Sequence, residues 1–588
     1  MKIFYSNTLR RVTGVALALL IMFSGISYGK MPVQAASIDA NYAKLLQESL
    51  YFYDANMCGN EVSKKSAFAW RNNCHAGDTK VKINGKNVNV SGGFHDAGDH
   101  IKLGLPQGYT ATILGIEYME FKKAFTDTSS AQHLKRITTH FCEYFERCTV
   151  LKSNGKVDFF VYQVSDGDED HKLWSAPETQ NEKRHVYYTS KNNPATDEVS
   201  EAAAALALQY INFGDKKALK YSKLLFDYAK SFDNKSCATW GLQDSSTGGL
   251  LYDSKSWGDD YALAAALLYK ATKQSAYKNE FDNVKRSSLG DYNIYSWFSW
   301  DNVSALADYY GTGSPDALKT CADNMKGQGG NGYVCLLEWG SARYNCNIQL
   351  LGLLYDKAVK QKTYLGWATG QMKYLLGDNP QKRCYVVGYN SRSVKYPHHR
   401  AASGSTDAGI ISPNRHVLLG ALVGGPKDSN GNYTDSQSDY QCNEVALDYN
   451  AGLVGAAAGL YLAHKNDTNA SVSLITSKDI KNKGLRFNYG LGLAKPKIKY
   501  AGNNKKKTVT LKWTKKKTAS GYEIQYSTKA NFKNKKTLNI KNKKIVSTKL
   551  TKLKKGRKYY IRIRAYKKVK GVKQYSAWSA RKIAKIKK

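Results

Sequence analysis

Beyond its first 36 residues, the chain of 588 residues has no long apolar run. The single such run, 15–23 (VALALLIMF), follows a positively charged start and precedes a small-residue stretch that ends before Ala36. This is the pattern of a secretory signal peptide, and the run is short for a membrane span. We therefore expect a signal peptide at 1–35, no membrane span after its cleavage, and a product that is secreted or held at the cell surface.

Cysteine is absent after Cys442, and the ten cysteines before that point form no CxxC pair and no zinc-like Cys/His spacing. An even number of cysteines in an exported chain permits disulfides. Cys58 with Cys74, and Cys142 with Cys148, are candidate pairs. Buried free thiols explain the same residues equally well.

Acidic residues are almost absent from the C-terminal segment, where Glu523 is the only one against 34 Lys and Arg from residue 494 onward. Most of the net charge of +40 therefore belongs to this segment. A polyanion is the expected partner of such a surface. Export and the lack of a recognition motif argue against nucleic acid, which leaves an anionic cell-wall polymer. A lysine-rich spacer that keeps the protein soluble is an equal alternative.

The region 36–466 is dominated by helical periodicity. Apolar residues recur at three- and four-residue spacing, and alanine supplies the close-packing positions. The strongest segments are 108–125, 200–213, 259–272, 347–359 and 445–465. Many such helices joined by long Gly/Asn-rich loops predict an all-α (α/α)6 toroid, with the chemistry on the loops of one face.

Near the C-terminus, the spacing of apolar residues changes to a period of two residues. Residues 467–493 read as a linker or extension, and 494–588 as a separate domain. The segments 508–513, 521–527 and 559–566 alternate apolar with polar residues, which predicts short half-buried strands in a small all-β sandwich. With YSAWS at 575–579, the segment resembles a fibronectin type III module.

Two aspartates stand close together in GGFHDAGDHIKLGLP (92–106). Asp96 and Asp99 are separated by only two small residues and flanked by histidines. A solvated turn or a calcium loop is one interpretation of this stretch. A carboxylate pair that accepts a proton from water is the other.

Further motifs favour the second interpretation. The stretch 433–451 (YTDSQSDYQCNEVALDYNA) resembles the signature of glycoside hydrolase family nine, the β-1,4-glucanase or cellulase family, and 92–106 resembles the segment that carries its catalytic base. WGSARY (339–344), LLGDNP (375–380) and CYVVGYNSRSVKYPHHR (384–400) follow the order of that family. The resemblance covers nearly all of 38–465.

The resemblance implies inverting hydrolysis by two carboxyl groups, one that protonates the departing oxygen and one that activates water. It makes Asp99 the general base, Asp96 a partner that holds the same water or tunes Asp99, and Glu444 the general acid with a raised pKa. Asp435 is implied as an orienting partner near Glu444. His398 belongs to the same catalytic set.

Substrate contacts are implied in the same way. Tryptophans stack on sugar rings, and basic or hydroxyl side chains bind the sugar hydroxyls. The implied residues are Trp339, Trp257, Arg343, Tyr344, Tyr449, Arg400 and His171. For an isolated Trp or Tyr, packing in the core is the ordinary alternative, and Trp257 has no motif to outweigh it.

This sequence departs from the motifs of the family at three places. Cys384 stands where Ser or Thr is typical, Asn390 where glycine is typical, and WSAPE (174–178) lacks a basic residue before its proline. The resemblance also implies a structural calcium, for which Asp197, Glu198 and Asp260 offer hard oxygen ligands. An acidic first helical turn without any metal explains these acids as well. Catalysis needs no cofactor.

The sequence therefore predicts a secreted endo-acting glucanase on cellulose and related β-glucans. Two alternatives remain open. One is a carbohydrate-binding or cell-surface protein without turnover, and the other is a related glycosidase, for example one that removes amino sugars from chain ends.

Overall fold

The structure is a computed structural model. It describes residues 40–465 except 181, 331 and 405–412, residues 484–485, and residues 495–587 except 506, 518, 570–571 and 577. The expected signal peptide lies outside the described residues, as does the expected linker except for 484–485. Within the described part of the chain, no helix has the length and apolar character needed to cross a bilayer.

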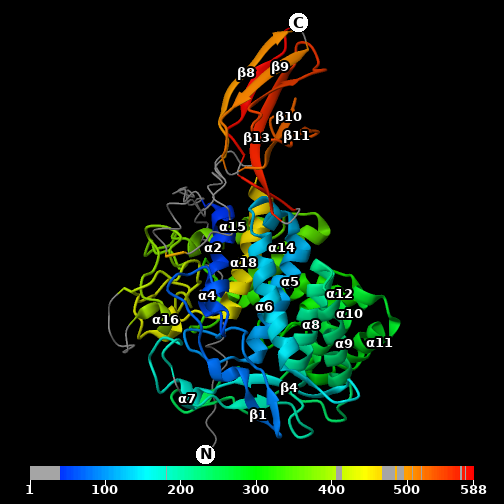
Figure 1. The fold of residues 1–588 in the computed structure, drawn as a ribbon, viewed down its shortest axis with the longest axis vertical. Coiled ribbons are helices and arrows are strands. Elements are labelled where there is room, and N and C mark those ends of the chain that lie inside the picture. Colours follow the sequence, from blue (N-terminus) through cyan, green and yellow to red (C-terminus); the bar gives the residue numbers. More distant parts are fainter. Residues whose placement is uncertain are drawn as a thin grey trace, which may run out of the picture. The chain divides into compact units, whose positions relative to one another are not determined.

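The region before residue 466 is helical, as expected. Six helices pack in sequence, α18 on α5, α5 on α8, α8 on α10 and α10 on α12, while α14 packs on α18 (Figure 1). These six are α5 (Gly104–Asp127), α8 (Thr196–Phe213), α10 (Gly258–Thr272), α12 (Ser304–Thr312), α14 (Ser341–Val359) and α18 (Leu447–His464). A second set covers them: α2 (Tyr42–Ser49), α6 (Ala131–Cys148), α9 (Lys216–Lys230), α11 (Ser275–Ser287), α13 (Asp316–Gln328) and α15 (Leu365–Leu375).

Small residues on the packing faces of the inner helices let these helices lie close together in the interior of the helical region. Helix α18 is buried along nearly its whole length, whereas α9 buries only one stripe of residues. A Cβ on Gly459 of α18 would approach the side chain of Leu353 on α14 to 2.9 Å, and one on Gly452 would overlap Asn347. The two helices therefore lie closer together than larger residues allow, which is the role expected of small side chains between packed helices.

The prediction of an all-α region is wrong in one respect, because short strands lie between the helices. Antiparallel strands β3 (Thr149–Leu151), β4 (Val157–Val164) and β5 (Val186–Tyr188) form a sheet in that order. Hairpins join β1 (Val81–Ile83) to β2 (Lys86–Val88) and β6 (Gln243–Asp244) to β7 (Gly249–Leu250). The remaining helices are single turns or little more: α3 (Tyr51–Asn56), α4 (Val62–Lys65), α7 (Gly167–Asp170), α16 (Arg400–Ser403) and α17 (Tyr440–Asn443).

The C-terminal segment is built of β-strands, as expected (Figure 1). One sheet has the order β11–β10–β13–β14, with β15 also paired to β13, and the other has the order β12–β9–β8. The strands are β8 (Ile498–Lys505), β9 (Thr508–Trp513), β10 (Gly521–Ser527), β11 (Lys536–Ile540), β12 (Ser547–Leu550), β13 (Lys558–Val569), β14 (Val572–Tyr575) and β15 (Lys582–Lys585). Trp513, Tyr522 and Ile561 belong to a core of its own. The alternation of apolar and polar residues in these segments therefore marks the strands of a two-sheet module.

Candidate active site

The loop that carries Asp96 and Asp99 is held by backbone hydrogen bonds to distant parts of the chain. Lys102 pairs with Val164 at the end of β4 through two bonds of 3.0 Å. The Asp96 carbonyl accepts from Leu447 N at the start of α18, again at 3.0 Å. These bonds bring the loop next to Glu444, more than 340 residues further along the chain.

Gly98 allows the closest of these approaches. Its carbonyl accepts from Arg400 N at 3.0 Å, and a Cβ at this position would overlap the carbonyl oxygen of His398. Only a residue without a side chain lets the two loops meet in this way. The glycine between the two aspartates is thus required by packing between loops.

One cavity of about 580 Å³ collects most of the predicted site residues. Its lining includes Asp96, Asp99, His171, Trp339, Arg343, His398, Arg400, Glu444 and Tyr449. They come from loops and helix ends spread over some 350 residues of sequence. The cavity therefore brings both expected carboxyl groups together with aromatic and basic side chains.

Glu444 lies at the end of α17, where it is half-buried and hydrogen-bonded. The indole Nε1 of Trp339 donates to its Oε2 at 2.9 Å. Burial raises the pKa of Glu444 to about 7, assisted by the charge of Asp99 and opposed by the Trp339 hydrogen bond. A carboxyl group with this pKa is still protonated in mildly acidic to neutral solution and can donate a proton.

Asp96 and Asp99 differ in their environments. Asp96 is 2% exposed, and burial together with the charge of Asp99 raises its pKa well above the usual range. Asp99 is half-buried and reaches His171, with 3.3 Å between its Oδ2 and Nε2. Of the two, Asp96 is the carboxyl group whose neutral form burial favours, and Asp99 is the less buried one that lines the cavity.

Three polar side chains of the cavity are fixed by partners behind them. Arg400 contacts the Asp170 carboxylate at 2.5 Å, and Arg343 contacts Asp448 at 3.0 Å. The Nδ1 of His398 lies 2.6 Å from the carbonyl oxygen of Gln437, to which it donates. Burial lowers the pKa of His398 to about 4. His398 is thus neutral and presents Nε2 as an acceptor.

The structure places three predicted site residues outside the cavity lining. Asp435 accepts hydrogen bonds from Lys395 N and Tyr396 N and pairs with Arg383 at 2.8 Å. It therefore shapes the loop before His398 together with Arg383, and its role as an orienting partner of Glu444 stays a prediction.

Trp257 packs in the core as the residue before α10, with its ring 6.2 Å from that of Tyr261. It is therefore not a stacking platform, which is the alternative that its lack of a motif left open. Tyr344 is buried behind Arg343, whose Nη2 donates to its hydroxyl at 3.0 Å. Tyr344 therefore lies outside the lining of the cavity, behind a guanidinium group that belongs to the lining.

Several lining residues escaped the sequence analysis: Trp174, Asp244, Tyr252, Trp300 and Tyr440. Trp174 stands three residues after His171, so that short stretch carried a usable signal. Tyr252 has a φ of +49°, which is rare for a residue with a side chain, and its hydroxyl donates to Asp448 Oδ1 at 3.5 Å. No spacing in the sequence links it to the aspartates.

The acids expected to bind calcium are buried at the first turns of α8 and α10. Asp197 accepts from Ala238 N at 3.1 Å. One oxygen of Glu198 and both of Asp260 are buried and have no hydrogen-bond partner among the described residues. Such oxygens fit a hard cation. However, within the described part of the chain, no three ligand atoms from this set come within 4.8 Å of one another.

A second metal-capable cluster was not expected from sequence. Cys58, Cys74, His75 and His95 bring their ligand atoms within 4.8 Å of one another in the protein interior. The distances are 3.9 Å between the two sulfurs, 3.3 Å between His75 Nδ1 and His95 Nε2, and 3.4 and 4.0 Å for two sulfur–nitrogen pairs. A tetrahedral zinc separates two sulfurs by about 3.8 Å and two nitrogens by about 3.3 Å. The four side chains fit that ion.

All ten cysteines are free, so neither predicted disulfide is present. The sulfurs of Cys58 and Cys74 are near each other but far beyond bonding distance. Cys142 and Cys148 are both buried on α6. The other group within ligand distance among the described residues, Asp99, Asp170 and His171, is already engaged in ion pairs to Arg400 and Asp244.

Comparison with known proteins gives two family matches. Residues 42–457 match the model of glycosyl hydrolase family 9, and residues 496–581 match the fibronectin type III domain. Endoglucanase B of Cellulomonas fimi is 32% identical over an alignment of 487 residues, and the match covers 76% of this chain and 44% of that protein. The chain therefore spans less than half the length of this relative.

Solved structures agree with the family match. The catalytic domain of Clostridium thermocellum CelT is 41% identical with a TM-score of 0.66, covering 72% of this chain and 97% of that one. The cellulase Cel9M of C. cellulolyticum, in a complex with cellobiose, is 36% identical with a TM-score of 0.64, covering 71% and 98%.

Proposed function

The chain belongs to glycosyl hydrolase family 9, and on that premise we propose that it hydrolyses internal β-1,4-glucosidic bonds of cellulose and related β-glucans with inversion. One observation carries the proposal. Glu444, with a pKa raised to about 7, lines the same cavity as Asp99, a carboxyl group held open to that cavity. This is the pair that acid/base hydrolysis of a glycoside needs.

The proposed steps follow from the protonation states. Glu444 donates its proton to the glycosidic oxygen as the bond to the anomeric carbon breaks. Asp99 accepts a proton from the water that attacks that carbon from the opposite face. Burial and the charge of Asp99 favour the neutral form of Asp96, and in that form Asp96 adds no second negative charge next to Asp99 and can donate a hydrogen bond to the water. Trp339 keeps the Glu444 carboxyl in place through its indole nitrogen.

Side chains around the cavity then position the glucan. Trp174, Trp300 and Trp339 present aromatic surface to sugar rings, and the fixed guanidinium groups of Arg343 and Arg400 donate to hydroxyls. We infer that the two sets of paired helices form the (α/α)6 toroid, which would hold these loops on one face. Successive contacts between the six inner helices support that arrangement.

The test compares Glu444→Gln with Glu338→Gln, the same change at an exposed residue 106 positions earlier. We expect release of reducing sugar from carboxymethylcellulose to fall by at least about 100-fold for the first variant alone. Equal, background-level release by the parent protein and by Glu444→Gln would favour the non-hydrolytic binder, whereas full activity of Glu444→Gln would show that Glu444 is not the acid. Products from defined cello-oligosaccharides, read with anomer detection, separate internal cleavage with inversion from a glycosidase acting at chain ends.

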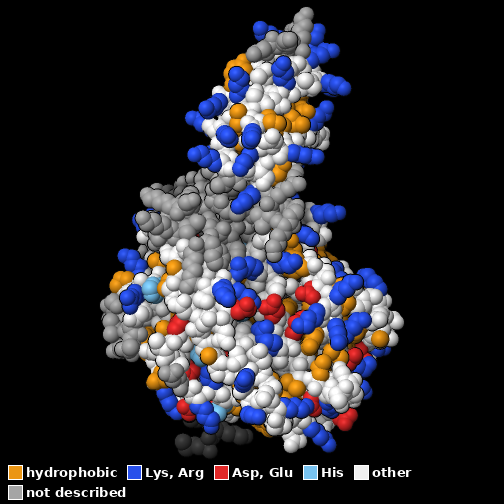
Figure 2. Space-filling model, in the orientation of Figure 1, with side chains coloured by type: hydrophobic (Ala, Val, Ile, Leu, Met, Phe, Trp, Pro, Cys, Tyr) orange, Lys and Arg blue, Asp and Glu red, His pale blue; other side chains and the backbone are white. Residues whose placement is uncertain are grey.

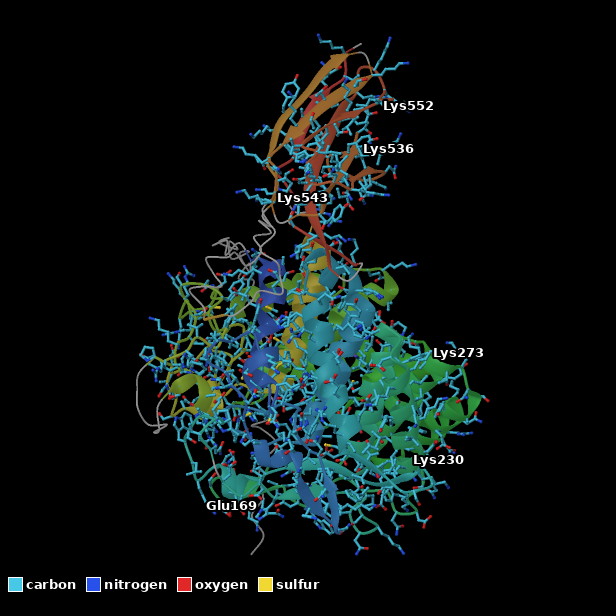
Figure 3. The ribbon with its side chains drawn as sticks, viewed as in Figure 1. Glu169, Lys230, Lys273, Lys536, Lys543 and Lys552 are labelled. Carbon is cyan, nitrogen blue, oxygen red and sulfur yellow. The ribbon has the colours of Figure 1, made fainter. Side chains whose placement is uncertain are left out.

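We further propose that the protein is exported and that its C-terminal module retains it on an anionic cell-wall polymer. Lys and Arg side chains dominate the module in the view of Figure 2, and Figure 3 shows Lys536, Lys543 and Lys552 projecting from it. A hollow of about 680 Å³ is lined by Lys536 and Lys552 with Tyr526 and Tyr560. The module's one acid, Glu523, already pairs with Arg564 at 2.8 Å and leaves this charge uncompensated.

Deleting residues 494–588 tests retention directly, since the truncated enzyme should appear in the medium. A milder variant replaces Lys536, Lys543 and Lys552 by Gln and preserves the strands. We expect its binding to isolated cell walls to weaken and to lose part of its salt dependence. Binding that stays unchanged in both proteins would leave the module as a soluble spacer.

Structural metal ions form the last part of the proposal. We infer that Cys58, Cys74, His75 and His95 hold zinc, because their spacing matches tetrahedral coordination. Calcium at the acidic first turns of α8 and α10 is supported by the unpartnered oxygens of Asp260. Neither ion takes part in the steps above. Zinc would anchor His95, the residue immediately before Asp96.

A further inference from the structure

His171 lies between two carboxylates that come from different loops. Its Nε2 is 3.3 Å from Asp99 Oδ2, and its Nδ1 is 3.1 Å from Asp244 Oδ2. His171 follows the short helix α7, and Asp244 ends strand β6. Because both ring nitrogens face an oxygen acceptor, the imidazole can donate in both directions only when it carries two protons.

Asp244 is held in place by its own loop. Its side chain is fully buried, and it accepts from Ser246 N at 3.1 Å, Ser246 Oγ at 2.6 Å and Thr247 Oγ1 at 2.9 Å. Burial opposes ionisation, but these donors and the charge of His171 lower the pKa of Asp244. It is therefore a fixed anion. Nothing in the chemistry of the acid/base pair requires it there.

Other charged groups also face His171. Burial alone would lower the pKa of the imidazole, and Arg400 acts in the same direction. The hydrogen bond and charge of Asp99, with the charge of Asp170, outweigh both and raise the pKa to about 9. The ring is thus an imidazolium over the acidic and neutral range. An anion on its far side is then needed to fix its orientation.

We propose that Asp244 is a positioning residue for the catalytic base, which it serves by holding the His171 imidazolium with Nε2–H directed at Asp99. The inference rests on the proposed function. In this arrangement each oxygen of Asp99 has a donor, because Ala97 N donates to Oδ1 at 3.3 Å and His171 contacts Oδ2. The Asp244 carboxylate also offsets the charge of the imidazolium, which would otherwise repel the positive charge that develops on the sugar ring.

The consequence of losing the Asp244 charge is a change of orientation. Without an anion at Nδ1, the imidazolium is free to turn, and Asp99 loses the donor that faces its Oδ2. Catalysis should therefore slow while binding of the substrate is little affected.

Asp244→Asn is the informative variant, because asparagine keeps the oxygen that accepts from Ser246 and replaces the oxygen that faces His171 and Thr247 by an amide nitrogen. Asp168→Asn is its matched control. Asp168 accepts from Ser245 N at 2.6 Å in the same pair of loops, and it lies outside the lining of the cavity. For Asp244→Asn we expect kcat on a soluble cello-oligosaccharide to fall about tenfold with little change in KM. The control should leave both unchanged.

A second measurement does not depend on activity. In protein labelled with 15N-histidine, the His171 signal is assigned by its loss in His171→Gln, and its titration midpoint should fall by about one pH unit in Asp244→Asn. In the His171→Gln background, adding Asp244→Asn should not change kcat further. Thermal unfolding of each variant establishes that it is folded.

Two results would overturn the inference: an unmoved His171 titration in folded Asp244→Asn, or an equal loss of kcat from that change with and without His171. Both are distinct from failure of the proposed function, which would show as no hydrolysis by the parent protein while the His171 titration still responds to Asp244.

Discussion

Replacing Trp339 by phenylalanine should move the alkaline limb of activity to higher pH. Glu444 must be protonated to act as the acid, so activity falls as pH rises through its pKa of about 7. The hydrogen bond from Trp339 Nε1 stabilises the carboxylate form and lowers this pKa. Phenylalanine keeps an aromatic ring but has no donor, so the pKa of Glu444 should rise.

The size of the shift follows from the hydrogen bond. A bond to a charged group contributes about 1.5–3 kcal/mol. The Trp339 side chain is 39% exposed, so the lower end of that range applies after screening by solvent. A difference of about 1.4 kcal/mol between the two protonation states corresponds to about one pH unit. We expect the alkaline limb of kcat/KM to move up by about that much.

The assay is release of reducing sugar from carboxymethylcellulose at low substrate concentration, from pH 4 to pH 10 in steps of about half a unit, because kcat/KM reports the free enzyme. Trp240→Phe is the control, since Trp240 is 46% exposed and lies outside the lining of the cavity. The loss of aromatic surface in the Trp339 variant, taken alone, would lower the rate at every pH and would leave the limb in place, so the position of the limb isolates the effect of the hydrogen bond. If the limb stays in place or moves to lower pH, Trp339 does not tune the acid and the reasoning is refuted.

Three further outcomes are expected. Gly98→Ala should lose about 1–3 kcal/mol of stability and unfold at lower temperature, because its methyl group would overlap the His398 carbonyl. The same overlap should displace the base and lower kcat about 100-fold. An unchanged kcat would contradict the close approach of the two loops. Asp99→Asn should lose about 100-fold or more in kcat, with binding of cellobiose retained in calorimetry. Purified protein should contain one equivalent of zinc by elemental analysis and melt at lower temperature after chelation. Cys58→Ser should lose that zinc, whereas Cys142→Ser, a buried thiol elsewhere, should keep it.

Local patterns were enough to predict most of the secondary structure. The segments 108–125 and 259–272 became α5 and α10, and 508–513 and 521–527 became β9 and β10. Their periods of 3.6 and 2 are properties of neighbouring residues, so no knowledge of the fold was needed. The sheet β3–β4–β5 was missed, because two of its strands have three residues and are too short to show a period.

Site residues could be identified only where a motif carried them. Asp99, Glu444 and Trp339 stand in motifs, and all three line the cavity. Asp435 stands in the same signature yet faces a different loop, because a motif records order along the chain and not direction in space. Asp244 had no motif around it.

By itself, the sequence determined the helices, the strands of the basic module, and the kinds of side chain available for chemistry. Only the tertiary structure decided their charge states and partners. It buried Asp96 and left Asp99 open, placed an indole donor on Glu444, and gathered two cysteines and two histidines into one cluster. The physical reason is that a pKa or a coordination site depends on desolvation and on distances of a few ångströms through space. Those quantities are set by how remote segments pack, and no neighbouring residue encodes them.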